Sequence, residues 1–227
     1  MAQRLTKKSL IRLSVIRFVV LVAVVFVCAG TFDYWRGWVF IAVFTTCNGL
    51  STAYLWKNNP ALMARRMAAG FSVEKEKSQK IIALLLSFII KLLLVFSVLD
   101  HRLQAQPLSL WDAMVGNALI VTGFCITFVV FRVNGFASAT VEAMNNHKII
   151  VTGPYAIIRH PMYIGSLCIL FGTPLALGSC RGLLISSLAV PLFVWRTIEE
   201  ERFLGERMPD YKKYQAATRW RLVPGVF

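Results

Sequence analysis

Six apolar runs, separated by short polar stretches, constrain the fold of this chain more than any other feature. They cover residues 13–31, 36–56, 81–99, 110–131, 162–178 and 182–196. Most approach the roughly 20 residues that a helix needs to cross the hydrocarbon core of a bilayer. With 57% hydrophobic and only 16% charged residues, the chain is also far more apolar than a soluble domain of its length. The sequence therefore predicts an all-α, polytopic membrane protein with about six spans.

The last two runs are the shortest, and both contain proline. They read YIGSLCILFGTPLALGS and GLLISSLAVPLFVW, with Pro174 in the first and Pro191 in the second. A proline inside a membrane helix frees a backbone carbonyl that neighbouring protein must satisfy. We therefore expect residues 162–196 to form a short C-terminal helical hairpin, tilted or broken, that packs against the other spans.

The basic residues are concentrated on alternate connections between the runs. Of the 25 lysines and arginines, 21 fall in the N-terminal stretch, in the 57–80 and 132–160 connections, and in the tail that starts at Arg196. Because lysine and arginine accumulate in cytosolic loops, both termini and the 132–160 connection are predicted to be cytosolic. The net charge of +14 predicts anionic lipid headgroups as partners at that face. We expect a multi-pass protein of a bacterial inner membrane rather than of the endoplasmic reticulum.

The sequence gives no support for a metal site or for nucleic-acid binding. The five cysteines lie in or at the ends of apolar runs, without a CxxC pair or a metal-like spacing to histidine. No nucleic-acid-binding module accompanies the positive charge. We therefore predict no metal and no nucleic acid as ligands.

The 132–160 connection leads into the motif GPYAIIRHPMYIG at residues 153–165. Gly153-Pro154 marks a turn, and Pro161 suits the first turn of a helix, where its missing N–H would be unpaired in any case. Arg159 and His160 are thereby placed at a helix N-terminus, whose amide groups and partial positive charge suit an anionic ligand. Two other interpretations stay open, namely an ordered loop without a ligand and an aromatic and basic anchor at the membrane interface.

The end of the last apolar run carries a second group of charges, in VWRTIEEERF. Arg196 and Glu200 are four residues apart and share one helical face, with Glu199 and Glu201 to either side. An ion pair between Arg196 and Glu200 would explain two of these charges. It does not explain three consecutive carboxylates at a surface that attracts anionic lipid. Ionisable residues at membrane depth are candidates for a functional site.

The segment VTGPYAIIRHPMYIG, followed by EERFL, PDYKKY and PGVF, resembles the isoprenylcysteine carboxyl methyltransferase and phospholipid methyltransferase superfamily of integral membrane enzymes. The close match covers residues 134–227, and NPALMARRM at residues 59–67 is similar to the loop that follows the second helix in that group. The resemblance implies a single domain over residues 1–227 with a cytosolic cofactor pocket. It also implies methyl transfer from S-adenosyl-L-methionine to a lipophilic substrate that enters from the bilayer.

The resemblance also implies site residues. It assigns to cofactor binding His147, Lys148, Ile149, Ile150, Tyr155, His160, Pro161, Met162, Tyr163 and Glu200, and we add Arg159 because of its place at the helix N-terminus. The resemblance assigns Arg196 to face the substrate, and we add Glu201 to the catalytic set as a candidate base. The chain departs from the family pattern at Glu199, a third glutamate, so that only Leu204 fixes the register of the EExxL motif.

Carboxyl O-methylation of an isoprenylcysteine-like group is the expected reaction, and Arg196 would orient that carboxylate. Phospholipid amine N-methylation is the alternative, and it needs a base, for which Glu201, Glu199 and Tyr163 are candidates. A nicotinamide-dependent, sterol-type membrane reductase shares the RHPxY step but neither the GPY turn nor EExxL. The non-enzymatic alternative is a small transporter or lipid-binding protein whose charges line a pathway.

The predicted topology is tested by labelling single-cysteine reporters in sealed cells, in a variant whose native cysteines are replaced. A membrane-impermeant reagent should reach a reporter placed at Gln104 and miss one placed at Asn146, because the positive-inside rule assigns these positions to opposite faces. Labelling of the Asn146 reporter from outside would overturn the topology.

Overall fold

The computed structural model describes residues 7–68, 76–103, 108–137 and 149–227, and helices dominate these residues. The helices are α1 Lys7–Ala29, α2 Trp35–Asn58, α3 Pro60–Ala68, α4 Lys77–Leu103, α5 Leu110–Val133, a 3-10 turn η1 Gly153–Ala156, α6 Pro161–Leu177, α7 Gly182–Arg207 and α8 Tyr211–Ala217. Within the described residues, extended pairing is limited to one isolated bridge between Ile158 and Trp220. The all-α prediction is confirmed.

Five of these helices, α1, α2, α4, α5 and α7, are long and apolar enough to cross a membrane, while α6 is apolar but has 17 residues. Large apolar side chains such as Val27, Phe88 and Leu184 are exposed on their outer surfaces. Such surfaces would be unfavourable in water but suit helices that face lipid. The chain is an integral membrane protein of the polytopic helical class.

The hairpin formed by α6 and α7 differs from the prediction in its second arm. Helix α7 does not end near residue 196 but continues without a break to Arg207, with Pro191 inside it. The apolar run marks only the part of the helix that suits the hydrocarbon core of the membrane. The glutamates and arginines that follow are good helix formers, so the helix itself continues. Arg196, Glu200 and Glu201 therefore project from a rigid helix.

Four glycines allow α5 and α6 to pack backbone against backbone. Gly116 and Gly123 lie on α5, opposite Gly172 and Gly165 on α6. A methyl group on Gly172 would stand 2.5 Å from the carbonyl oxygen of Gly116, and one on Gly123 would overlap the carbonyl oxygen of Gly165. Small residues permit this close approach between membrane helices, where apolar packing is the main attraction. The glycines thereby set where the first turn of α6 lies relative to α5.

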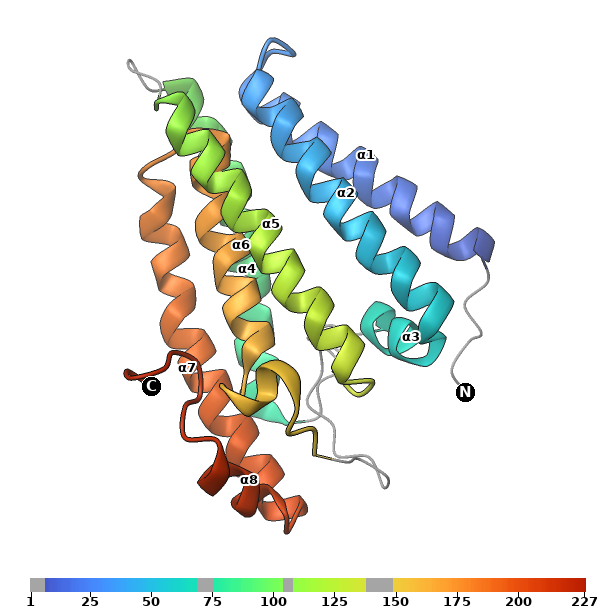
Figure 1. Ribbon diagram of the computed structural model, residues 1–227. Helices are drawn as coiled ribbons and strands as arrows, with labels where there is room; N and C mark the ends of the chain where they lie inside the picture. The colour runs from blue at the N-terminus through green and yellow to red at the C-terminus, as the bar shows by residue number, and fades with distance from the viewer. Residues whose placement is uncertain (1–6, 69–75, 104–107, 138–148) are drawn as a thin grey trace.

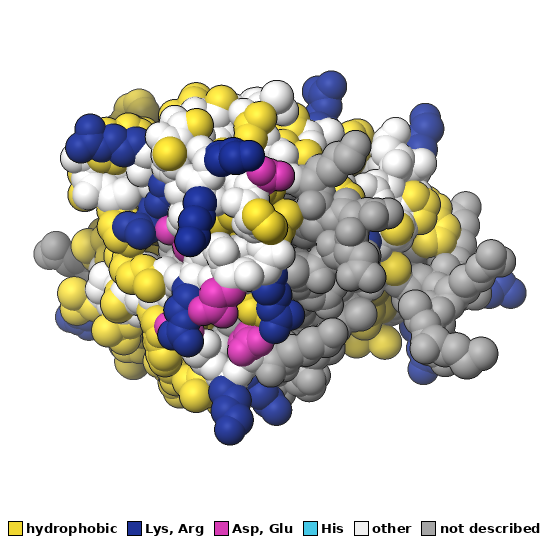
Figure 2. All heavy atoms as spheres, turned by 90° about the horizontal axis from the view of Figure 1, so that it is seen from below, with side chains coloured by type: hydrophobic (Ala, Val, Ile, Leu, Met, Phe, Trp, Pro, Cys, Tyr) yellow, Lys and Arg dark blue, Asp and Glu magenta, His cyan; other side chains and the backbone are white. Residues whose placement is uncertain are grey.

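The helices lie side by side along one common direction, with α1 and α2 forming a pair beside α4–α7 (Figure 1). Helix α3, η1, α8 and the last turns of α5 and α7 gather at the lower end in that view. Seen from below, this end carries lysine and arginine side chains with a few carboxylates among them (Figure 2). These elements belong to segments that the basic residues assign to the cytosol, and that assignment stays a prediction.

The glycine contact predicts a specific sensitivity to added volume. Gly123→Ala should lower the free energy of unfolding by about 1–3 kcal/mol, because the new methyl group meets backbone that can move only with the whole helix. Gly49→Ala is the matched control, since Gly49 lies in α2 and a methyl group there meets no atom within 4 Å. Thermal unfolding in detergent should show a loss for Gly123→Ala alone, and equal stability of both variants would contradict the packing.

Candidate active site

A cavity of about 370 Å³ lies at the end of the bundle where α3, η1 and α8 gather. Leu86, Phe124, Ile169 and Phe193, from α4, α5, α6 and α7, supply apolar lining. The polar lining comes from Arg66, Thr127, Asn134, Tyr155, Arg159, His160, Tyr163, Ser166, Arg196, Glu200, Tyr211 and Tyr214. A concave site with apolar walls and a few polar groups is typical of small-molecule binding.

The C-terminal segment holds the residues that lead into α6. The backbone N–H of Arg159 donates to the carbonyl of Trp220 at 2.9 Å, and that of His160 donates to Arg221 at 3.0 Å. The N–H of Tyr163 donates to the carbonyl of His160 at 3.1 Å, closing the first turn behind Pro161. These three amides are therefore not open to an anion, contrary to the expectation of free donors at this helix N-terminus.

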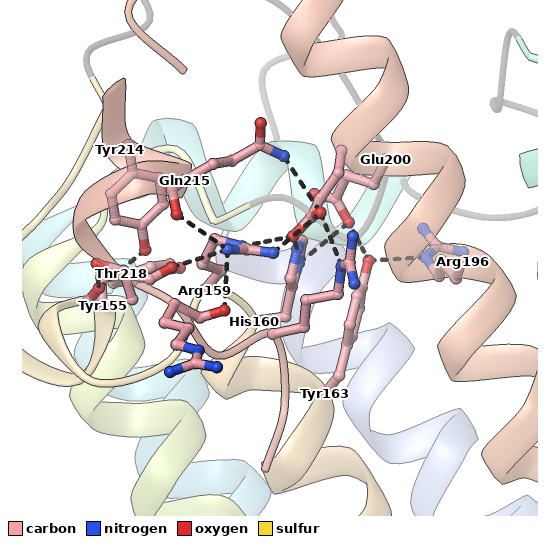
Figure 3. A network of polar contacts seen from close by, with 12 residues as sticks. Tyr155, Arg159, His160, Tyr163, Arg196, Glu200, Tyr214, Gln215 and Thr218 are labelled. Carbon is pink, nitrogen blue, oxygen red and sulfur yellow. Dashed lines mark hydrogen bonds and ion pairs between the residues drawn. The ribbon is translucent and has the colours of Figure 1, made fainter. Parts of the chain in front are cut away.

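The carboxylate of Glu201 is the centre of a buried polar cluster. Figure 3 shows three of the residues that contact it, Arg159, His160 and Gln215. Its Oε1 accepts from Arg159 Nε at 2.6 Å, and its Oε2 accepts from Arg221 Nε at 2.9 Å. Gln215 Nε2 donates to Oε2 at 3.2 Å, and His160 Nε2 lies 3.3 Å from Oε1. These partners belong to the start of α6 and to the C-terminal segment, so the carboxylate joins both to α7. Hydrogen bonds between charged groups are stronger than those between neutral groups, which makes this a firm connection.

The guanidinium of Arg159 completes the same cluster from the other side. Its Nη1 donates to the carbonyl oxygens of Thr218 at 2.8 Å, Arg219 at 3.2 Å and Gln215 at 3.3 Å. Each of its three nitrogens thus donates to protein, to Glu201 or to the C-terminal segment. Although Arg159 lines the cavity, its contacts indicate that it mainly holds the surrounding chain together.

Tyr163 connects the two charged residues that lie one turn apart on α7. Its hydroxyl donates to Glu200 Oε2 and accepts from Arg196 Nε at 3.0 Å. The rings of Tyr163 and His160 stack in parallel, with centroids 5.4 Å apart. Arg196 is buried, so the arrangement is not the exposed ion pair considered from the sequence. The tyrosine hydroxyl thereby positions Arg196 and Glu200 along the cavity wall.

The turn before α6 supplies Tyr155, which is fixed at both of its polar ends. Asn134 Nδ2 donates to the Tyr155 hydroxyl at 2.8 Å, and the Tyr214 hydroxyl donates to the Tyr155 carbonyl at 2.9 Å. Burial raises the pKa of Tyr155 to about 12, an effect that the Asn134 contact partly opposes. Tyr155 is therefore a neutral, rigid aromatic wall rather than a titrating group.

The structure brings most of the predicted site residues to this cavity. Its lining includes Ile149, Ile150, Tyr155, Arg159, His160, Pro161, Met162, Tyr163, Arg196 and Glu200. Glu201 lies behind the lining, in the buried cluster, and its catalytic role stays a prediction. His147 and Lys148 lie outside the described residues.

Sequence reasoning assigned no role to six polar residues of the lining, Arg66, Thr127, Asn134, Ser166, Tyr211 and Tyr214. Arg66 belongs to NPALMARRM, and Tyr211 and Tyr214 belong to PDYKKY, two motifs that already stood out. The motifs marked the segments, but only the folded chain shows which side chains reach the cavity.

Residues 111–209 match the phospholipid methyltransferase family model. The protein-S-isoprenylcysteine O-methyltransferase of Rattus norvegicus is 32% identical over 128 residues, which are 51% of this chain and 43% of the rat protein. The Homo sapiens enzyme is 31% identical over 128 residues, 51% of this chain and 43% of the human protein. The cobalt-zinc-cadmium resistance protein CzcN of Cupriavidus metallidurans is 27% identical over 116 residues, 50% of this chain and 48% of that protein.

The chain thus spans about half the length of the curated relatives it matches. The matched region of the family model includes the α5–α6 contact, the turn before α6 and the glutamates of α7. These matches confirm the resemblance that the GPY, RHPMY and EERFL motifs carry.

The contacts of the buried cluster predict that Glu201 stabilises the folded protein even when no ligand is bound. Glu201→Gln should lower the free energy of unfolding by about 3–5 kcal/mol, because Arg159 would stay buried without its carboxylate. The control Glu206→Gln removes an exposed carboxylate paired with Arg202 and should change stability by less than about 0.5 kcal/mol. Thermal unfolding without any ligand measures both, and a Glu201→Gln variant as stable as the control would refute the role.

Proposed function

We propose that this relative of the isoprenylcysteine carboxyl methyltransferase and phospholipid methyltransferase superfamily is a membrane methyltransferase that uses S-adenosyl-L-methionine and a lipophilic acceptor. The acceptor reaction we infer is carboxyl O-methylation of an isoprenylcysteine-like group. The observation that carries the proposal is one cavity whose polar lining holds Glu200, His160 and Arg196, while its apolar lining comes from the helices of the membrane bundle. Such a cavity suits a polar cofactor beside an apolar chain.

The lining residues fit the chemistry of S-adenosyl-L-methionine. This cofactor carries an ammonium, a carboxylate and a nucleoside, and when bound it supplies a methyl group activated by a sulfonium. Glu200 is the one carboxylate among the described lining residues and suits the ammonium or the ribose hydroxyls. Tyr155 with Ile149 and Ile150 offers an aromatic and apolar wall for the nucleoside.

The contacts of the candidate bases favour a carboxylate acceptor over an amine. Glu201 accepts hydrogen bonds from Arg159, Arg221 and Gln215, and Glu199 Oε2 accepts from Ser78 at 3.0 Å. The Tyr163 hydroxyl already donates to Glu200. An ionised carboxylate loses no proton on methylation and needs none of these bases. The contribution of this chain is then to align the acceptor and exclude water.

Arg196 is the residue we assign to orient the acceptor carboxylate. It is buried on α7 one turn before Glu200, and Tyr163 fixes its Nε. Phe193, one turn further toward the membrane, lines the apolar part of the cavity and would contact the hydrocarbon of the acceptor. A planar guanidinium matches a carboxylate in two-pronged geometry better than an ammonium does.

Phospholipid amine N-methylation is the second candidate, favoured by the family model that matches residues 111–209. The test uses purified protein in detergent. Titration with S-adenosylhomocysteine should show saturable binding, and a reduced nicotinamide nucleotide should not bind. Transfer of a labelled methyl group to a prenylcysteine analogue would support carboxyl O-methylation. Transfer only to an ethanolamine phospholipid would instead support amine N-methylation and refute the carboxylate assignment. Binding of the nicotinamide nucleotide alone would overturn both.

The two residues that Tyr163 connects should have separable effects. Glu200→Gln should weaken S-adenosylhomocysteine binding by about 1.5–3 kcal/mol, the range for a lost charge-assisted hydrogen bond. Arg196→Ala should leave that affinity nearly unchanged while it lowers turnover and acceptor binding, and Arg196→Lys should restore only part of the activity. Cofactor titration beside a methyl-transfer assay measures both quantities. Equal, small effects of both substitutions on both quantities would indicate a plain structural contact.

A further inference from the structure

Helix α3 brings two adjacent arginines to the site end of the bundle, and the sequence motif around them has no role in the function described so far. The helix begins after Asn59, whose side-chain Oδ1 accepts from the N–H of Leu62 at 3.0 Å. Leu62 and Met63 are buried against Val130 and Phe131 of α5. This packing fixes α3 beside the end of α5 and determines where the next turn points.

The two arginines of that turn have different environments. Arg65 Nη2 donates to the carbonyl of Gly135 at 2.7 Å, and Arg65 is not among the residues that line the cavity. Arg66 does line the cavity. Its Nη1 donates to the carbonyl of Ala137 at 3.0 Å and to Met162 Sδ at 3.5 Å, and its guanidinium lies 4.5 Å from the centre of the Phe131 ring.

Arg66 has no carboxylate partner in the part of the chain that the structure describes. Burial lowers its pKa to about 10, which still leaves the guanidinium charged at neutral pH. Among the described residues only Nη1 makes hydrogen bonds, so the other N–H donors are available to a ligand. A half-buried cation without a counter-ion is unfavourable, and an anionic ligand in the cavity would offset that cost.

The position of Arg66 indicates which anion this is. Arg66 contacts Met162 and Glu200 contacts Tyr163, so charges of opposite sign reach adjacent residues in the first turn of α6. Arg66 approaches that turn from α3, whereas Arg196 approaches it from α7, where its Nε donates to the Tyr163 hydroxyl. An α-amino acid carries its ammonium and its carboxylate on one carbon, and thus matches a pair of opposite charges on neighbouring residues.

We propose that Arg66 binds the carboxylate of the amino-acid part of S-adenosyl-L-methionine while Glu200 receives its ammonium. The inference rests on the proposed function, because it assigns a residue to the cofactor of that reaction. The backbone amides of Arg159, His160 and Tyr163 are used by protein carbonyls, so these three donors are closed to the cofactor carboxylate, whereas Arg66 offers it a charged side-chain donor at the cavity. Tyr155 and Met162 pack in the same apolar cluster as Leu62 and Phe131, so Arg66 lies on the side of the residues assigned to the cofactor.

The test compares S-adenosyl-L-methionine with its decarboxylated form, which lacks only the carboxylate, by calorimetric titration of the full-length protein in detergent. Wild-type protein should bind S-adenosyl-L-methionine about 10- to 100-fold more tightly than the decarboxylated form. In Arg66→Gln that preference should disappear, through weaker binding of S-adenosyl-L-methionine and unchanged binding of the decarboxylated form. Arg66→Lys should recover part of the preference.

Arg65→Gln is the matched control, because it removes the neighbouring guanidinium, which contacts Gly135 and does not line the cavity. This variant should keep the wild-type preference. A preference that survives in Arg66→Gln would overturn the assignment, as would equal weakening of both ligands by that substitution. If wild-type protein bound neither ligand, the proposed function itself would be refuted. That outcome differs from a failure of this inference, in which wild-type protein binds S-adenosyl-L-methionine but Arg66 is not responsible for the preference.

Discussion

The carboxylate of Glu201 is the contact on which the geometry of the site depends. It lies on α7, binds Arg159 and His160 at the start of α6, and binds Arg221 in the C-terminal segment. Without it α7 would lose its charged contacts with the other two segments, and the Arg159 guanidinium would stay buried without a carboxylate partner. The neighbouring Glu200 reaches the cavity because Glu201 holds this part of α7 against the start of α6. Adjacent glutamates thus have different surroundings, because Glu201 joins three segments of the chain whereas Glu200 lines the cavity.

The cavity lies between two kinds of constraint. Toward the membrane, the glycine contact between α5 and α6 fixes the helix backbones and places Phe124 and Ile169 along the apolar wall. At the polar end, hydrogen bonds fix side chains, with Tyr163 between Arg196 and Glu200, and Asn134 on Tyr155. Preorganised groups of this kind lower the entropy lost when ligands are aligned. This arrangement suits the proposed pairing of a polar cofactor with a lipophilic acceptor.

The helices were predictable because membrane spans are encoded locally, as long apolar runs, and the cavity residues followed from motifs that the family shares. What the sequence did not reveal depends on contacts between distant segments. No residue near Arg159 indicates that its side chain pairs with Glu201, 42 residues away. Nor does the local sequence indicate that the carbonyls of Trp220 and Arg221 accept hydrogen bonds from the N–H groups that precede α6. The apolar run stops at residue 196 because hydrophobicity reports the membrane boundary, whereas α7 continues to Arg207 through polar residues with high helical propensity.

In the proposed function, cofactor and acceptor share one cavity, with the cofactor at the polar end beside η1, α6 and α7. A structure of the protein in lipid nanodiscs with S-adenosylhomocysteine tests this most directly. The account predicts the nucleoside against Tyr155 and the amino-acid part beside Glu200, with the apolar part of the cavity, near Phe193, left for the acceptor. Density for S-adenosylhomocysteine outside this cavity, or in its apolar part between the membrane helices, would contradict it.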